Sequence, residues 1–343
     1  MRRIGILTGG GDAPGLNAVI RAVVRKVKEN DIEVFGLLQG WKGALTGEGF
    51  ILKEEDVEDI HTLGGTIIQS SRTNVYKTED GPAKVRETMN RLGLECIVAI
   101  GGDDTIGVAN KLQKDGMNMV AVPKTIDNDL SATDSTFGFD TAVNIAADAI
   151  DRLHTTAKSH SRILVVETMG RYTGWIALTA GMASGAHYIA IPEFPVTVDD
   201  IVKTINERKA KGKKYSIVVV SEGCKFSDLP EETAQSTDSF GHVRLVKREI
   251  GPKLAEELEA RIGMEARAVV LGHLQRGGTP TAFDRVLGTK FGLRAAELVI
   301  AQKYGYMVAL KGNNVIPVQM EEAVATLKKV DEELYNFSGT FFG

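Results

Sequence analysis

The amino-acid sequence predicts an α/β protein with two doubly wound, mostly parallel-sheet lobes. Short runs rich in β-branched residues alternate with amphipathic segments along nearly the whole chain. This alternation is typical of a parallel sheet with helices on both faces. At 343 residues the chain also exceeds the roughly 250–300 residues at which a single hydrophobic core stops growing, so we expect two lobes.

Each expected element follows from a local change of period or composition. Nearly continuous apolar runs predict strands at 3–8, 95–100, 117–122, 162–167, 187–191, 215–223 and 265–273. Apolar residues at helical spacing predict helices at 16–30, 105–116, 139–158, 172–185, 199–212, 246–263 and 283–305. The runs 306–312 and 314–318 are expected to form a hairpin, 320–335 a closing helix, and the polar, aperiodic stretch 225–241 a loop.

Composition and charge exclude several classes of protein. Hydrophobic residues make up 43% of the chain, and a formal net charge of -4 argues against nucleic acid as a partner. Cys96 and Cys224 lie far apart without a C-x-x-C pair, which argues against a disulfide framework or structural zinc and fits the cytoplasm. No window approaches the roughly 18 apolar residues of a membrane span, and the N-terminal run breaks at Gly9 as a first strand would, unlike a signal peptide.

Six polar or glycine-rich stretches come directly after expected strands, where open α/β sheets bind their ligands. They are Gly9–Gly15, Gly101–Thr105, Lys124–Asp129, Glu167–Arg171, Ser221–Gly223 and Gly272–Gly278. Because the carboxyl ends of parallel strands meet at one edge of a sheet, we expect these stretches to converge on one cleft.

The stretch GGGDAPGLN at residues 9–17 joins a strand to a helix. Its glycines allow backbone N–H groups and the helix N-terminus to face an anion, although a tight βα turn explains the stretch equally well when it is taken alone. The G-x-G-x-x-G fingerprint fails at Pro14 and no G-x-x-x-x-G-K-[ST] occurs. Neither NAD binding nor a Walker-type NTPase is therefore supported.

Four carboxylates follow two expected strands. Asp103 and Asp104 come after the strand at 95–100, and Asp127 and Asp129 after the strand at 117–122. Taken alone, the second pair is more typical of a turn with solvated acids, but a carboxylate there can also accept the proton of an attacking hydroxyl. Carboxylates that face one cleft repel each other unless a cation lies between them. The pattern therefore predicts Mg²⁺ and, with it, a phosphate ligand.

Cationic residues form the complementary half of the expected site. Arginine offers a planar fork suited to phosphate oxygens, although a single arginine is more often a solvated surface charge. Several near strand ends are expected to face the cleft together: Arg72, Arg162, Arg171, Arg267 and Arg276, with His273. From the residues alone we predict magnesium-assisted phosphoryl transfer to a small phosphorylated molecule.

Five motifs, in order and spacing, resemble the phosphofructokinase family along nearly the whole chain: TGGGDAPGLNAVIR, GGDDT, PKTIDND, RILVVETMGR and LGHLQRGGTPTAFDR. The resemblance implies Mg²⁺-dependent phosphorylation of fructose 6-phosphate at its 1-hydroxyl to fructose 1,6-bisphosphate. It also implies a homodimer or homotetramer with subunit-shared active sites. We expect a donor-binding lobe at 1–138, rejoined by part of 255–310. We expect the sugar-phosphate lobe and closing helix at 139–254 and 311–343, with the active site in the cleft between the lobes.

By position in these motifs, the resemblance implies a role for each site residue. Asp127 is expected to accept the 1-hydroxyl proton, Asp103 to hold Mg²⁺, and Arg171 to stabilise the transferring phosphoryl group. The donor is expected to contact Gly10, Gly11, Arg72 and Gly102. The sugar phosphate is expected to contact Thr125, Ile126, Asp129, Met169, Gly170, Glu222, His273, Leu274, Gln275 and Arg276, and, from a neighbouring subunit, Arg162 and Arg267.

Two departures concern the phosphoryl donor. GGDD and PKTIDND stand where the ATP-dependent bacterial pattern has GGDG and PGTIDND, and the pair resembles the pyrophosphate-dependent branch. We expect Asp104 to exclude the α-phosphate of ATP by bulk and charge, and Lys124 to compensate Asp104 and stabilise the leaving phosphate. The alternative is that Asp104 only caps the following helix. Trp41, like Arg72, matches a position near the donor in ATP-using members.

Two other functions fit the same motifs. An ATP-dependent 6-phosphofructokinase is the alternative enzyme, and a catalytically silent sugar-phosphate binder is the alternative of another class. Asp103, Thr125, Asp127 and Arg171 argue against the binder, which has no use for a base beside a metal site. In the family's effector pocket Arg21, Arg25 and Lys213 match, whereas His154 and His187 replace the expected arginine and glutamate, which argues against the usual allosteric control.

Overall fold

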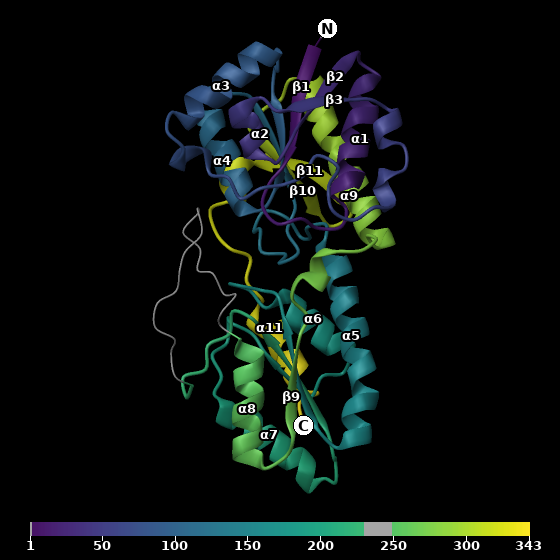
Figure 1. Cartoon of the computed structure of the whole chain (residues 1–343), viewed down its shortest axis with the longest axis vertical. Helices are drawn as coiled ribbons and strands as arrows, with labels where there is room; N and C mark the ends of the chain where they lie inside the picture. Colours follow the sequence, from purple (N-terminus) through teal and green to yellow (C-terminus); the bar gives the residue numbers. More distant parts are fainter. Residues whose placement is uncertain (1, 230–248) are drawn as a thin grey trace. The chain divides into compact units, whose positions relative to one another are not determined.

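The computed structural model describes residues 2–229 and 249–343, which form two compact units (Figure 1). Unit 1 comprises residues 1–141 and 276–327, and unit 2 comprises residues 142–275 and 328–343. Residues 311–327, which we expected in the second lobe, belong to unit 1, because residues 314–319 pair in register with residues 306–311 of its sheet. The chain returns to unit 1 at Arg276.

Unit 1 is built on a seven-stranded sheet in the order β11-β10-β5-β4-β1-β2-β3. Its five inner strands are parallel, and β3 and β11 are antiparallel edges. The strands are β1 (Arg2–Thr8), β2 (Ile32–Leu37), β3 (Gly49–Leu52), β4 (Ile97–Gly101), β5 (Met119–Pro123), β10 (Tyr306–Lys311) and β11 (Asn314–Gln319). The expected hairpin at 306–318 is confirmed, whereas β2 and β3 were not expected from the sequence.

Helices cover both faces of this sheet. They are α1 (Leu16–Lys28), α2 (Trp41–Thr46), α3 (Gly81–Leu92), α4 (Asp103–Lys114), α9 (Ala282–Ile300) and α10 (Met320–Ala323). Helices α1 and α9 pack side by side and share one hydrophobic core with alternate residues of the strands, such as Ile4, Ile6 and Val98. Helix α4 packs against β4 and β5, and Figure 1 shows it with α3 across the sheet from α1. Burial on both faces explains why these strands are nearly continuous apolar runs.

The strand order of unit 1 determines where a ligand can bind. The chain runs from β1 to β2 on one side and then returns to β4 on the other side, so the order reverses between β1 and β4. Loops at the carboxyl ends of two such strands leave in opposite directions and open a crevice. The residues that follow β1 and β4 are the glycine turn at 9–15 and the start of α4 at Asp103.

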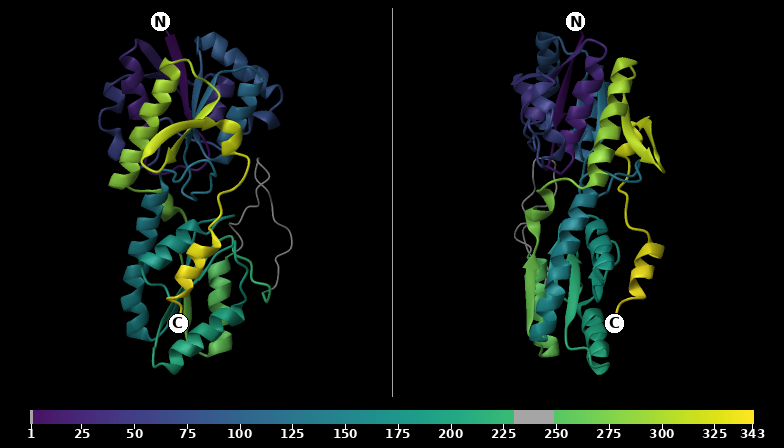
Figure 2. Two further views of the ribbon diagram at one scale, coloured as in Figure 1. Left: turned by 180° about the vertical axis from the view of Figure 1, so that it is seen from behind. Right: turned by 90° about the vertical axis from the view of Figure 1, so that its right-hand side faces the viewer.

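Unit 2 is a parallel four-stranded sheet in the order β7-β8-β6-β9. Its strands are β6 (Ile163–Thr168), β7 (Tyr188–Ala190), β8 (Ser216–Ser221) and β9 (Ala266–Val270), and its helices are α5 (Phe139–His160), α6 (Trp175–Ala183), α7 (Val198–Ala210), α8 (Ile250–Ile262) and α11 (Glu332–Gly339). Helices α7 and α8 share a core with one face of the sheet, and β9 is an edge strand. Figure 2 shows these elements from two further sides.

The segment after the hairpin forms two short helices. The closing helix at 320–335 is wrong as a single element, because α10 ends at Ala323 and α11 starts only at Glu332, where Asp331 caps it by accepting the Leu334 N–H. The chain passes from unit 1 to unit 2 between these helices. Most of the expected loop at 225–241, and residues 246–248 of the expected helix, lie outside the described residues.

We expect Gly292→Ala to destabilise the protein by about 1–3 kcal/mol, as overpacking of a close-packed core does. A Cβ atom at Gly292 of α9 would lie 2.6 Å from the Val19 carbonyl oxygen and 2.7 Å from the Ala22 Cβ of α1, so the two helices would have to separate. Urea unfolding measures the loss of stability. Gly107→Ala on α4 is the matched control: its Cβ would meet nothing within 4 Å, and we expect a gain of up to about 1 kcal/mol. Equal stability of the Gly292 variant and the natural protein would contradict the prediction.

Candidate active site

The turn after β1 is tied to the end of β5 by a buried lysine. Lys124 is 3% exposed, and its ammonium donates a hydrogen bond of 2.6 Å to the Gly11 carbonyl oxygen. Burial, followed by repulsion from Arg276, lowers the pKa of Lys124 to about 8, while Asp127, Asp12 and Asp103 act in the opposite direction. The positive charge of this lysine is therefore held among carboxylates and a carbonyl oxygen of unit 1.

The glycine turn differs in one respect from the expectation. The N–H groups of Gly9 and Gly10 donate to the carbonyl oxygens of Ile100 and Ser71, so these two groups are already used within the protein. Gly10 instead contributes its conformation, because its φ of +80° lies in the left-handed region. The turn is thereby fixed against β4 and against the segment at 70–72, which ends in the exposed Arg72.

Thr105 fills the space between the turns that follow β1 and β4. A Cβ atom at Gly9 would lie 2.5 Å from the Thr105 hydroxyl oxygen, and one at Gly101 would lie 2.3 Å from the Thr105 Cβ. Only glycine allows these turns to approach so closely. Thr105 is the last residue of GGDDT, and no role for it was predicted from the sequence.

The predicted carboxylates lie at the ends of β4 and β5. Asp103 and Asp104 occupy the first turn of α4, where the helix dipole favours negative charge. Asp127 follows β5 in a turn held by its own N–H, which donates to the Thr125 hydroxyl oxygen at 3.1 Å. Strands β4 and β5 are neighbours in register, with Gly101 opposite Pro123, so both groups start from the same edge of the sheet.

Asp129 lies in a buried environment near two other carboxylates. Burial raises the pKa of Asp129 to about 8, with further contributions from the negative charges of Asp127 and Asp103. Both effects favour the protonated form of Asp129. Three of the acids that the sequence placed after two separate strands, Asp103, Asp127 and Asp129, therefore interact in the structure.

Arg276 is the first residue of its motif that belongs to unit 1, because residues 271–275 lie in unit 2 and residues 276–285 in unit 1. Its guanidinium donates to the Asp12 carbonyl oxygen at 3.1 Å and lies over Gly11, where a Cβ atom would come within 2.5 Å of it. The residue thus flanks the glycine turn of unit 1.

A second group lies at the carboxyl ends of the strands of unit 2. Gly170 follows β6 with φ +136°, and its carbonyl oxygen accepts from the Ser221 hydroxyl at 2.6 Å and the Gly223 N–H at 3.0 Å. The Met169 N–H donates to the amide oxygen of Gln275, which is fully buried. Arg171 lies within 5.9 Å of the Tyr172 ring centroid, and His273 and Leu274 are exposed.

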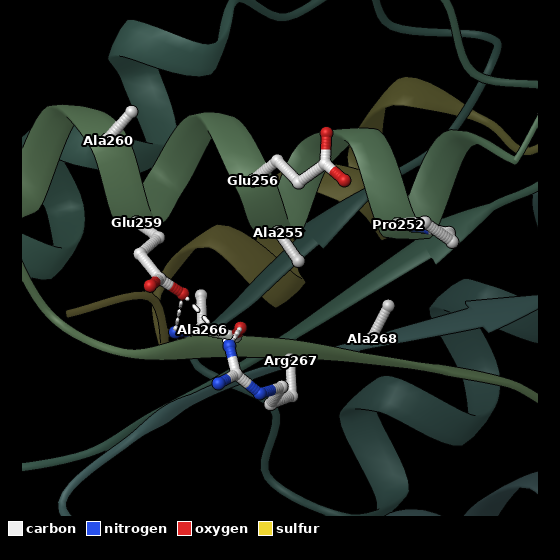
Figure 3. A pocket seen from close by; sticks show the side chains of 8 residues that line it. All are labelled: Pro252, Ala255, Glu256, Glu259, Ala260, Ala266, Arg267 and Ala268. Atoms are coloured by element: carbon white, nitrogen blue, oxygen red, sulfur yellow. Dashed lines mark hydrogen bonds and ion pairs between the residues drawn. The ribbon is translucent and has the colours of Figure 1, made fainter.

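Arg162 and Arg267 are placed differently from our expectation for a common cleft. Arg162 precedes β6 and Arg267 is the second residue of β9, so both lie at the amino ends of strands whose carboxyl ends carry Arg171 and His273. Both guanidinium groups pair with Glu265, and Figure 3 shows Arg267 also reaching Glu259 of α8 at 3.1 Å. The six residues of β6, about 20 Å, thus separate Arg162 from the loop that carries Arg171.

Trp41 and the two substituted histidines have packing roles. The indole of Trp41 is 1% exposed at the start of α2, so it presents no face to a nucleotide base. His154 and His187 pack edge-to-face at 5.6 Å, and both pack against Tyr215. The ring of His187 accepts the Ile217 N–H at Nδ1, at 2.8 Å, and His154 Nε2 donates to the Ser184 carbonyl oxygen.

Among residues 2–229 and 249–343, no three histidine, cysteine, aspartate or glutamate side chains are arranged to enclose a metal ion. None of the helices in this described part of the chain has the length and apolar character needed to cross a bilayer.

The two groups define a class of protein. Parallel strands that end in glycine turns, clustered carboxylates and buried or clustered cations are the arrangement of a phosphotransferase. The family model "Phosphofructokinase" matches residues 3–299. A pyrophosphate–fructose 6-phosphate 1-phosphotransferase of Amycolatopsis mediterranei (strain S699) is 54% identical over 99% of this chain and 100% of that relative.

Two further relatives agree on the family, and one of them is named for a different phosphoryl donor. An ATP-dependent 6-phosphofructokinase 3 of Streptomyces coelicolor is 48% identical over 97% of this chain and 98% of its own. The solved structure of Pichia pastoris phosphofructokinase in the T-state has 30% identity and a TM-score of 0.83 over 99% of this chain, which spans 36% of that longer chain. The chain belongs to the phosphofructokinase family, whose members are phosphotransferases acting on a hydroxyl group.

We expect His187 to remain neutral in the folded protein down to pH about 3. Burial, followed by the nearby charges of Arg208, His154 and Lys213, lowers its pKa from 6.5 to about 3. Between these pH values the unfolded chain binds a proton that the folded protein lacks, so His187 makes stability fall as pH falls below about 6.5. Proton NMR of the imidazole measures the titration, and the resonance is assigned by its loss in His187→Gln. A midpoint near 6.5 in the folded protein would contradict this prediction.

Proposed function

We propose that the protein transfers a phosphoryl group from pyrophosphate to the 1-hydroxyl of fructose 6-phosphate, reversibly and with Mg²⁺, in glycolysis or gluconeogenesis. Two features carry the donor assignment: the buried lysine ammonium bonded to the Gly11 carbonyl oxygen, and an extra carboxylate, the half-buried Asp104, in the first turn of α4.

Asp127 is the proposed general base. A carboxylate that stays ionised can accept the proton of the 1-hydroxyl as the oxygen attacks phosphorus. The raised pKa of Asp129 supports this role for Asp127. Two neighbouring carboxylates do not both ionise readily, so Asp127 would act as the base while Asp129 keeps its proton and donates a hydrogen bond. Asp129, with Thr125 and Ile126, would then hold the sugar beside the base.

The carboxylates of unit 1 fit Mg²⁺. The ion prefers oxygen ligands, keeps several waters and is commonly bound through one or two carboxylates together with substrate phosphates, so a complete protein cage is not required. Burial and repulsion from Asp127 and Asp103 raise the pKa of Asp129. A bound cation would reduce this repulsion. Asp103 would hold the ion, which supplies charge neutralisation for the phosphates when it is bound.

Lys124 and Asp104 together favour pyrophosphate as donor. Lys124 would stabilise the leaving phosphate, together with Gly10 and Gly11 of the glycine turn, Gly102 before α4 and Arg72 after Ser71. The carboxylates that raise the pKa of Lys124 are Asp127, Asp12 and Asp103, so the charge of the lysine is compensated without a contribution from Asp104. Asp104 would place bulk and negative charge against the α-phosphate of a nucleotide. The buried Trp41 supports the same donor, because it offers no surface for stacking on a base.

Unit 2 supplies the proposed contacts to the sugar phosphate. Met169, Gly170, Glu222, His273, Leu274 and Gln275 come from the carboxyl ends of β6, β8 and β9, with Arg171 as the cation that stabilises the transferring group. The placement of Arg162 and Arg267 at the opposite ends of these strands supports a different use: each would serve a site on a second copy of the chain. We propose a homodimer or homotetramer with shared sites.

ATP is the alternative donor, and the identity to an ATP-dependent relative is a specific reason to test it. A panel of pyrophosphate, ATP, ADP and polyphosphate with fructose 6-phosphate and Mg²⁺ separates the two functions, since the proposal requires pyrophosphate to give the highest kcat/KM. A protein that uses ATP well and pyrophosphate poorly would be the ATP-dependent enzyme, and a folded protein without turnover on any donor would be a sugar-phosphate binder.

We expect Asp104→Gly to gain measurable use of ATP, and Asp104→Gly with Lys124→Gly to gain more, while pyrophosphate turnover falls. Asp104 opposes the α-phosphate, and Lys124 stabilises the phosphate that leaves. Initial rates with each donor measure the change. Asp115→Gly, at the other end of α4, is the matched control and should leave donor preference unchanged. If Asp104 only stabilises the start of α4, the variant loses thermal stability and gains no ATP use.

We expect Asp127→Ala to lower turnover by ~10²–10⁴-fold and Arg162→Ala to raise chiefly the KM for fructose 6-phosphate. Because the two residues would meet only across a subunit boundary, mixing the two inactive or impaired variants should restore part of the activity. Subunit exchange is verified by native mass spectrometry. Exchange without recovered activity would contradict shared sites.

A further inference from the structure

The C-terminal residues 328–343, here called the C-terminal strap, are bound to unit 2 by side-chain contacts. The Trp175 indole N–H donates to the Lys328 carbonyl oxygen at 2.8 Å, and the Lys328 ammonium lies 5.2 Å from the Trp175 ring centroid. The Tyr335 hydroxyl donates to the Ile189 carbonyl oxygen, and its ring stacks on Phe194 at 4.6 Å. Figure 1 shows α11 beside α6 accordingly, and the two helices are in contact.

One carboxylate joins this strap to the start of α6. The Gly174 N–H lies 3.0 Å from each carboxylate oxygen of Glu193, and Glu193 Oε1 also accepts the Val330 N–H at 3.1 Å. Gly174 is the N-cap of α6, and its own position provides no side-chain cap. Glu193 therefore supplies the acceptor and the negative charge that the beginning of this helix otherwise lacks.

The loop at 169–174 is consequently held at both ends. At its beginning, the Gly170 carbonyl oxygen accepts from Ser221 and Gly223 of the β8 end. At its end, Gly174 is fixed by Glu193, and a Cβ atom there would lie 2.2 Å from Ile191. Arg171 lies between these two anchors, so its backbone position depends on both.

We propose that Glu193 is a positioning residue for Arg171, and that the C-terminal strap holds Glu193 in place through the Val330 N–H. The proposal rests on the proposed role of Arg171 at the transferring phosphoryl group. A cation stabilises developing charge only where it is placed in advance, and a misplacement of about 1 Å can cost a factor of about 10² in rate. The C-terminal strap, far from β6 in sequence, would thus set the efficiency of the reaction.

Glu193→Gln tests the proposal, because glutamine keeps the size of the side chain but presents an NH₂ group where the carboxylate has its second acceptor oxygen. We expect kcat to fall by about 10-fold to 100-fold. The KM for fructose 6-phosphate should rise, since Met169 and Gly170 belong to the same loop, and the KM for pyrophosphate should stay the same. Glu333→Gln on the exposed side of α11 is the matched control and should leave all three constants unchanged.

Trp175→Phe provides an independent test of the C-terminal strap. It removes the N–H that binds the Lys328 carbonyl oxygen. The KM for fructose 6-phosphate should again rise while the KM for pyrophosphate stays the same, and the rise should be smaller than in Glu193→Gln. Because both residues act on one segment, the effects of Glu193→Gln and Trp175→Phe should be less than additive. A fully additive pair would contradict the coupling through the strap.

Two outcomes would overturn the proposal. The first is an unchanged kcat in Glu193→Gln. The second is a kcat that falls only in proportion to the loss of folded protein, as measured by thermal unfolding, while both KM values stay unchanged. Arg171→Ala, assayed in parallel, separates this inference from the proposed function. If Arg171→Ala is inactive and Glu193→Gln is normal, only the inference about Glu193 fails; full turnover in Arg171→Ala contradicts the role proposed for Arg171.

Discussion

A buried ammonium group holds together the loops that carry the site of unit 1. Lys124 leaves the end of β5 and reaches the Gly11 carbonyl oxygen beyond β1, across the intervening strand β4. Removing a charge from water is costly unless it is paired, and this charge is compensated by one carbonyl oxygen and three nearby carboxylates. The carboxylates in turn depend on the lysine, because without it and a metal cation they would only repel each other. The glycine turn, Asp103 and Asp127 are therefore parts of one electrostatic unit.

Close approach of the backbone is the second condition for this arrangement. The side chain of Thr105 occupies the space that a Cβ atom would need at Gly9 and at Gly101. The Arg276 guanidinium does the same at Gly11. The glycines of these motifs thus serve packing as well as ligand access, and two of their N–H groups are bound within the protein. A glycine-rich turn after a strand does not by itself show which of its N–H groups can face an anion.

The direction of the strands gives the arginines of unit 2 two separate roles. Arg171 follows β6 and Arg162 precedes it, so the same strand carries them at opposite ends. In the single chain Arg162 and Arg267 are neutralised by Glu265, and Arg267 additionally by Glu259. Glu265 therefore keeps two like charges together at the amino ends of these strands. This explains why a net acidic chain can hold several cationic residues near strand ends without directing them all to one ligand.

The sequence alone determined the fold class, the family and most members of the two residue groups. The pattern of apolar residues indicates which strands are buried on both faces, and the motifs show which residues follow those strands. Both are local properties of the chain. Tertiary structure decided what local patterns do not contain. Residues 311–327 joined unit 1 through strand pairing, Arg276 joined the glycine turn, and Glu193 met Gly174 and Val330 from far along the chain. Each of these depends on a contact between residues distant in sequence, and only the packing of the completed chain brings such residues together.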